Sequence, residues 1–232
     1  MLSDGLRATG KAGKPKQYFC EKLEARYGAQ YQLDPAADYA DYVRRVVLAA
    51  ATPNHVFGCK LMGWDLQSFL ARLRRTLAFG PPNAPDLLLL RAALPGLKFI
   101  YIRRRDRLRQ AISKARALQS DIWRFDQSKQ PLSPAEFDPK LISHCIEDVT
   151  REEEILSEFF EQSRIKPFCF EYEDFCHDYQ GCLEAALKFL GLRVPRGITL
   201  RGPLTIRQAD ATSEEWETRY RALASVALSS KM

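Results

Sequence analysis

The stretch LKFIYI, residues 97–102, constrains the fold of this chain more than any other feature of its sequence. It is almost wholly apolar, it follows a Pro-Gly pair, and a helical pattern begins directly after it. Two further apolar runs, HVFGCKLM (residues 55–62) and KPFCFEYEDF (166–175), are also followed by helical patterns. Such strands alternating with helices are typical of a parallel sheet covered on both faces. We therefore predict an α/β fold, with the sheet flanked by helices.

A long amphipathic helix is predicted over residues 138–162. Its apolar positions recur at helical spacing and are assigned to the core; they are Leu141, Cys145, Val149, Leu156, Phe159 and Phe160. The chain has 232 residues, which suits one large domain better than two. We therefore predict a single domain over residues 1–232.

Composition narrows the class of protein. Apolar residues make up 46% and charged residues 28% of the chain, which argues against disorder and against a membrane protein. No apolar run approaches the roughly 20 residues that span a bilayer. The six cysteines form no Cys-x-x-Cys pair, and no His stands at zinc spacing. This pattern predicts reduced thiols in a cytoplasmic protein without a metal site.

Positive charge is concentrated in one segment. Residues 102–116 hold seven Lys or Arg against one Asp, a local charge of +6 that equals the formal net charge of the whole chain. The segment follows a predicted buried strand, and open α/β sheets bind ligands beyond the carboxyl ends of their strands. Guanidinium groups suit phosphate oxygens, so a phosphate site is predicted. A solvated basic face and nucleic-acid binding stay open, although no aromatic residues interleave and no nucleic-acid-binding motif is present.

Four segments, in order, resemble the bacterial trehalose sulfotransferase family. They are LRATGKAGKPKQYF, TPNHVFGCKLMGW, IYIRRRDRLRQAISKARALQSDIW and TIRQADATSEEWETRYR, and together they extend over nearly the whole chain. The resemblance implies a P-loop-like α/β fold and transfer of a sulfuryl group from 3′-phosphoadenosine 5′-phosphosulfate to a hydroxyl of a small, carbohydrate-like acceptor. It also implies a homodimer.

The resemblance assigns residues to the nucleotide. An Arg at a strand end and a Ser on the next helix bind the 3′-phosphate in such enzymes, and these positions match Arg104 and Ser113, with Arg105 as an alternative register. A later loop closes over the nucleotide, and RQAD matches it through Arg207 and Gln208. Taken alone, RQAD reads as an ordinary turn before the last helix.

The acceptor side is assigned in the same way. The family places a catalytic Glu where this chain has Gln17, in PKQYF. An amide cannot take up a proton, so the base position is altered. Lys14 makes this segment basic, and Lys60 would face the acceptor or the sulfuryl group, or be solvated. Trp123 would line the acceptor pocket or be a core aromatic residue.

The family's loop for the 5′-phosphosulfate directly precedes a helix that matches residues 1–10, MLSDGLRATG. The resemblance therefore implies an N-terminally truncated sheet that lacks this loop and its strand. Together with Gln17, this leads us to expect a sulfotransferase that is weak or inactive. The alternatives are a non-catalytic relative that binds a nucleotide or anion and, with less support, a nucleic-acid-binding protein.

Overall fold

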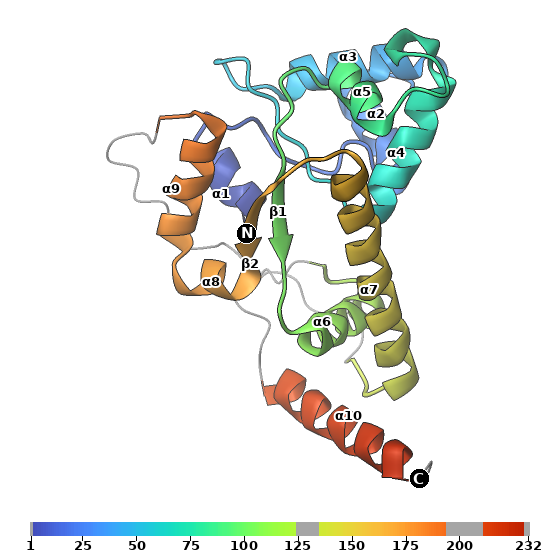
Figure 1. Cartoon of the computed structure of the whole chain (residues 1–232), viewed down its shortest axis with the longest axis vertical. Helices are drawn as coiled ribbons and strands as arrows, with labels where there is room; N and C mark the ends of the chain where they lie inside the picture. Colours follow the sequence, from blue (N-terminus) through green and yellow to red (C-terminus); the bar gives the residue numbers. More distant parts are fainter. Residues whose placement is uncertain (1, 124–134, 194–210, 230–232) are drawn as a thin grey trace. The chain divides into compact units, whose positions relative to one another are not determined.

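The computed structural model of the chain describes residues 2–123, 135–193 and 211–229 (Figure 1). The chain divides into two compact units. The first unit comprises residues 1–103 and 152–203, and the second comprises residues 104–151 and 204–232. The assignment of all 232 residues to a single domain stays a prediction.

A small parallel sheet lies in the first unit. Strand β1 (Ile100–Arg103) pairs in parallel with β2 (Phe168–Glu171), and Ile100 lies opposite Phe168 (Figure 1). The sheet has two strands among the described residues, and the fold is mixed α/β with mostly helices. The predicted strands at residues 97–102 and 166–175 are thus confirmed in shortened form, as is their parallel pairing.

The strand predicted at residues 55–62 is wrong. This segment makes one isolated parallel bridge, between Cys59 and Lys16, and no extended strand. The backbone groups that would lengthen the ladder have other partners. The Lys14 N–H donates to the Ala50 carbonyl at 3.2 Å, and the Val56 carbonyl accepts from the Thr52 N–H at 3.0 Å. The apolar run correctly indicated contact with the core, since Phe57, Cys59 and Leu61 are partly buried against it, but it did not indicate the backbone pairing.

Most of the first unit is helical. Its described helices are α1 (Leu2–Ala8), α2 (Glu21–Tyr31), α3 (Tyr39–Ala50), α4 (Gly63–Arg75), α5 (Asp86–Ala93), α8 (Tyr172–His177), α9 (Tyr179–Leu190) and the second half of α7 (Pro139–Gln162), with a short 3-10 turn at Leu77–Phe79. The larger core contains Phe19 and Phe69, whose rings stack 4.2 Å apart. A second core joins Leu2 and Leu6 of α1 to Leu183 and Leu187 of α9.

The second unit is built from helices. It contains α6 (Arg107–Ser120), α10 (Ala211–Ser229) and the first half of α7 (Pro139–Gln162). Small residues on α6, Ala111 and Ala115, are fully buried beside Ile142 and Cys145 of α7 and Trp216 of α10. Alanines let helices approach closely, which makes room for the large indole of Trp216 in this core.

The predicted helix over residues 138–162 is confirmed as α7. Its apolar stripe contributes to two cores, because the boundary between the units falls within α7, after Arg151. Leu141 and Cys145 pack in the core of the second unit, whereas Leu156 and Phe159 pack in the larger core of the first. A single periodic stripe therefore does not by itself predict a single core.

Candidate functional site

The segment that leads into α6 carries the residues predicted to bind phosphate. Arg104 and Arg105 stand between the end of β1 and Asp106, the residue that caps α6. The Asp106 carboxylate accepts a hydrogen bond from the Arg109 N–H at 2.9 Å, and this begins the helix. Ser113 follows in the second turn. Arg105 is exposed, whereas Arg104 and Ser113 are half-buried.

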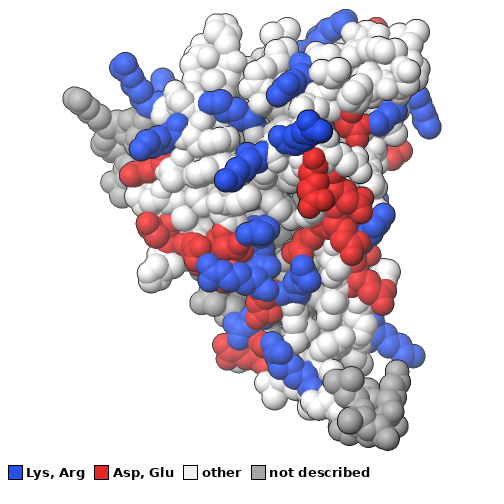
Figure 2. Space-filling view, in the orientation of Figure 1, with Lys and Arg blue, Asp and Glu red and all other residues white. Residues whose placement is uncertain are grey.

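Several basic side chains of residues 102–116 are engaged within the protein. The contacts are Arg103 with Glu171 at 2.6 Å, Arg109 with Glu217 at 2.7 Å, Lys114 with Asp148 at 3.0 Å and the Arg116 guanidinium with the Ser213 hydroxyl at 2.6 Å. Lys and Arg side chains also lie among Asp and Glu on the face drawn in Figure 2, rather than as one continuous basic surface. The charge available to an external anion is therefore smaller than the sequence count suggests.

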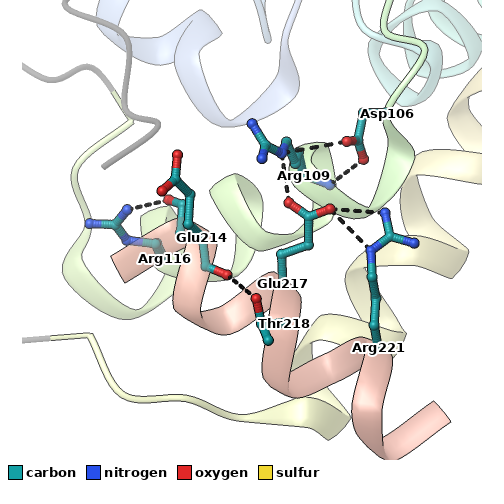
Figure 3. A network of polar contacts seen from close by, with 8 residues as sticks. Asp106, Arg109, Arg116, Glu214, Glu217, Thr218 and Arg221 are labelled. Atoms are coloured by element: carbon teal, nitrogen blue, oxygen red, sulfur yellow. Dashed lines mark hydrogen bonds and ion pairs between the residues drawn. The ribbon is translucent and has the colours of Figure 1, made fainter. Parts of the chain in front are cut away.

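Glu217 of α10 is the centre of a polar network with α6 (Figure 3). It accepts hydrogen bonds from Arg109 at 2.7 Å and from Arg221 at 2.9 Å, and Arg109 also lies 3.5 Å from Asp106. Burial disfavours the charged carboxylate, but the hydrogen bonds from Arg109 and Arg221 outweigh it and hold the pKa of Glu217 below its usual range. The network fastens α10 to the helix that carries Ser113.

In the first unit, two predicted acceptor-side residues lie next to each other. The bridge between Lys16 and Cys59 is followed by a hydrogen bond from the Lys60 N–H to the Lys16 carbonyl at 2.9 Å. In this register, Gln17 and Lys60 are the neighbouring pair. Lys14 is exposed at the start of the same segment. Residues 43 positions apart in the sequence, Gln17 and Lys60, are thus brought together.

Asp65 is a neighbour of Gln17 that the sequence interpretation missed. The Gln17 side-chain amide donates to Asp65 Oδ2 at 3.3 Å, and the backbone N–H of Met62 donates to the same oxygen at 3.3 Å. The thiol of Cys20 also lies here, and its pKa is raised by burial and by a hydrogen bond with Asp65. We call Gln17, Cys20, Lys60 and Asp65 the Gln17 cluster.

The sequence gives a signal for one of the two contacts of Asp65, the cap at the start of α4, and none for its contact with Gln17. An Asp three residues after Met62, at the start of a helical pattern, is typical of a residue that caps a helix. Its contact with Gln17 joins positions 48 residues apart, and no local pattern predicts that.

Three other predicted site residues have different outcomes. Trp123, beyond the end of α6, is 59% exposed, so it is not a core aromatic residue of the described chain. Arg207 and Gln208 lie outside the described residues. The roles assigned to all three stay predictions.

Comparison with known proteins shows the family of the chain. The model of the Stf0 sulphotransferase family matches residues 1–223. The chain belongs to this family. Trehalose 2-sulfotransferase of Mycolicibacterium smegmatis is 28% identical over 95% of this chain and 89% of its own length. Trehalose 2-sulfotransferase of Mycobacterium tuberculosis is 28% identical over 96% of this chain and 90% of its own length.

As an Stf0 sulphotransferase, the protein is an enzyme of sulfuryl transfer. In the part of this sulphotransferase that the structure describes, no group of three or more His, Cys, Asp or Glu side chains is arranged to hold a metal ion. Within the same residues, no helix combines the length and the apolar character required to cross a membrane.

Proposed function

We propose that the protein transfers a sulfuryl group from 3′-phosphoadenosine 5′-phosphosulfate to a hydroxyl of a small carbohydrate. The observation that carries this proposal is the family match over residues 1–223, which includes both the segment leading into α6 and the Gln17 cluster. The six unpaired cysteines support a reducing compartment, and we propose the cytoplasm. Homodimer formation stays a prediction.

The 3′-phosphate of the donor is assigned to Arg104 or Arg105, together with Ser113. A guanidinium offers paired donors that match phosphate oxygens, and a hydroxyl adds one further hydrogen bond. The first backbone N–H groups of α6 favour an anion at the same end of the helix. Arg207 and Gln208 are proposed as further nucleotide contacts from the residues that precede α10.

The acceptor is assigned to Lys14, Gln17, Lys60 and Trp123. Trehalose is the first acceptor to test, because both relatives are trehalose 2-sulfotransferases. The ammonium groups of Lys14 and Lys60, both exposed, also suit a sugar that carries an acidic substituent. A panel of neutral and acidic sugars therefore discriminates between these acceptor classes.

Nucleotide binding tests the donor assignment. Isothermal titration with 3′-phosphoadenosine 5′-phosphate is compared with 5′-AMP, which lacks the 3′-phosphate. We expect the bisphosphate to bind at least about tenfold more tightly, as one or more charge-assisted hydrogen bonds allow. Either Arg104→Gln or Arg105→Gln removes this preference, whereas Arg91→Gln on α5, which removes the same charge elsewhere, keeps it. Equal affinity for both nucleotides in the unmodified protein refutes the donor assignment.

A second candidate function rests on Gln17. With an amide at the family's base position, the protein would bind the nucleotide without transferring sulfate. Transfer of labelled sulfate from the donor to trehalose or to any sugar of the panel rules out this candidate. Binding of the bisphosphate nucleotide with no transfer to any acceptor supports it.

A further inference from the structure

The Gln17 cluster contains a carboxylate that the family assignment does not use. Gln17 occupies the assigned base position, but its amide can only donate or accept a hydrogen bond. Its Nε2 donates to Asp65 Oδ2 at 3.3 Å. A group able to accept a proton therefore lies one hydrogen bond away from the assigned position, on a different segment of the chain.

The carboxylate of Asp65 is held by hydrogen bonds from uncharged donors. Oδ2 accepts from the Gln17 amide and from the Met62 N–H, and the Cys20 thiol lies near this carboxylate. The backbone of Glu152 packs against Gly63 at the start of α4, because a Cβ on Gly63 would lie 2.8 Å from the Glu152 carbonyl oxygen. Asp65 is thus half-buried in the first turn of α4, and Lys60 is the basic residue of the cluster.

Glu21, four residues after Gln17, is less suited to act as a base. Its carboxylate pairs with the Arg72 guanidinium at 3.2 Å, and its side chain is 71% exposed. Arg72 also pairs with the buried carboxylate of Glu24. The Arg72 guanidinium therefore pairs with both acidic side chains of this turn of α2, which makes them poorer proton acceptors. The donors to Asp65, in contrast, carry no charge.

We propose that Asp65 is the general base of this sulfotransferase, a role that rests on the sulfuryl transfer proposed above. The acceptor O–H bond breaks as its oxygen bonds to the donor sulfur, and the proton passes to the Asp65 carboxylate. The bond between sulfur and the bridging phosphate oxygen breaks, and its electron pair leaves with 3′-phosphoadenosine 5′-phosphate. The protonated carboxyl group then releases its proton to water. The Gln17 amide orients Asp65 and the acceptor hydroxyl.

Transfer of labelled sulfate to trehalose, or to the best acceptor of the panel, tests the proposal in the full chain. Asp65→Asn keeps a side-chain oxygen that can cap α4 but removes the base. We expect kcat to fall about 10²–10⁴-fold with KM nearly unchanged. The matched control is Asp38→Asn, which alters the carboxylate that caps α3 through the Asp41 N–H at 2.9 Å in the same unit. This control keeps the rate of the unmodified protein.

Rescue separates a chemical role from a structural one. Adding Gln17→Glu to Asp65→Asn places a carboxylate at the position where the family has its base. We expect this double variant to recover kcat at least about tenfold over Asp65→Asn alone. Binding of 3′-phosphoadenosine 5′-phosphate shows that each variant is folded.

Three outcomes would overturn the proposal. In the first, Asp65→Asn keeps the kcat of the unmodified protein. In the second, the rate falls equally in Asp65→Asn and Asp38→Asn and is not rescued. In the third, the unmodified protein transfers no sulfate, which also refutes the proposed function. The first two outcomes leave the proposed function standing, so the two failures are distinguishable.

Discussion

At the scale of single residues, Gly13 is held in a conformation and a space that exclude a side chain. Its φ is +74°, and a Cβ there would clash with the backbone nitrogen of Gly58 and lie 2.8 Å from the Phe57 carbonyl carbon. We expect Gly13→Ala to lower the free energy of unfolding by about 3 kcal/mol or more, because strain and a backbone clash add. Urea denaturation at pH 7 measures it.

Gly10 supplies the control for this prediction. Its φ is +63°, but a Cβ there would meet nothing within 4 Å. Gly10→Ala should therefore cost only the left-handed strain, about 1–2 kcal/mol. Equal losses in the two variants would show that Gly58 does not pack against Gly13 as closely as described.

The predictability of the site also differs from residue to residue. The placement of Arg104, Arg105 and Ser113 between a strand and a helix was predicted from the sequence, because the three residues lie on one segment; their role stays a prediction. Gln17 and Lys60 were each assigned to the acceptor side by the resemblance, and the bridge that joins their segments is seen only in the structure. Asp65 was missed because its contact with Gln17 depends on the path of the chain between them.

At the scale of elements, the attachment of α10 to α6 makes the second unit sensitive to acid. The folded state holds the pKa of Glu217 below its unfolded value of 4.5. Unfolding therefore takes up a proton in acid, and the stabilisation is present above pH 4.5 and is lost as the pH falls through the folded pKa. We expect Glu217→Gln to lower the free energy of unfolding by about 1.5–3 kcal/mol at pH 7 and to flatten the fall of that free energy as the pH drops below 4.5.

Glu215→Gln is the matched control on the same helix. Glu215 is 59% exposed and pairs with Arg219, one turn away at 3.0 Å. Exposed pairs of this kind contribute about 0.2–0.5 kcal/mol, so chemical denaturation of Glu215→Gln across the same pH range should follow the unmodified protein. A pH profile of Glu217→Gln that also follows it would contradict the network of Figure 3.

Elements with long, regular patterns were predicted well. The periodic stripe of α7 predicted a helix within one residue of its observed ends, Pro139 and Gln162. The strand predicted at residues 55–62 is absent because an apolar stretch indicates contact with the core, but it does not indicate which backbone groups pair with each other. The contact of α6 with α10 could not be predicted from the sequence either, since Arg109 and Glu217 are separated by 108 positions.

At the scale of the whole molecule, internal ion pairs limit what its net charge of +6 can attract. Arg103, Arg109 and Lys114 face carboxylates of this chain at 2.6–3.0 Å. We expect duplex DNA of mixed sequence to bind weakly at 50 mM salt and to be released by 200 mM, because few phosphates are neutralised. Fluorescence anisotropy measures this. Tight binding with a steep salt dependence would restore the nucleic-acid alternative.

The parallel pairing of β1 with β2 has a consequence for how the chain acquires its structure. The ion pair between Arg103 and Glu171 at the end of the sheet joins residues 68 positions apart. Closing a flexible loop of that length costs about 4 kcal/mol in chain entropy, before the pairing returns any stabilisation. During synthesis, β1 leaves the ribosome long before its partner strand exists. Helices α3, α4 and α5 lie entirely before β1 in the chain, so they can form while the first strand still awaits its neighbour.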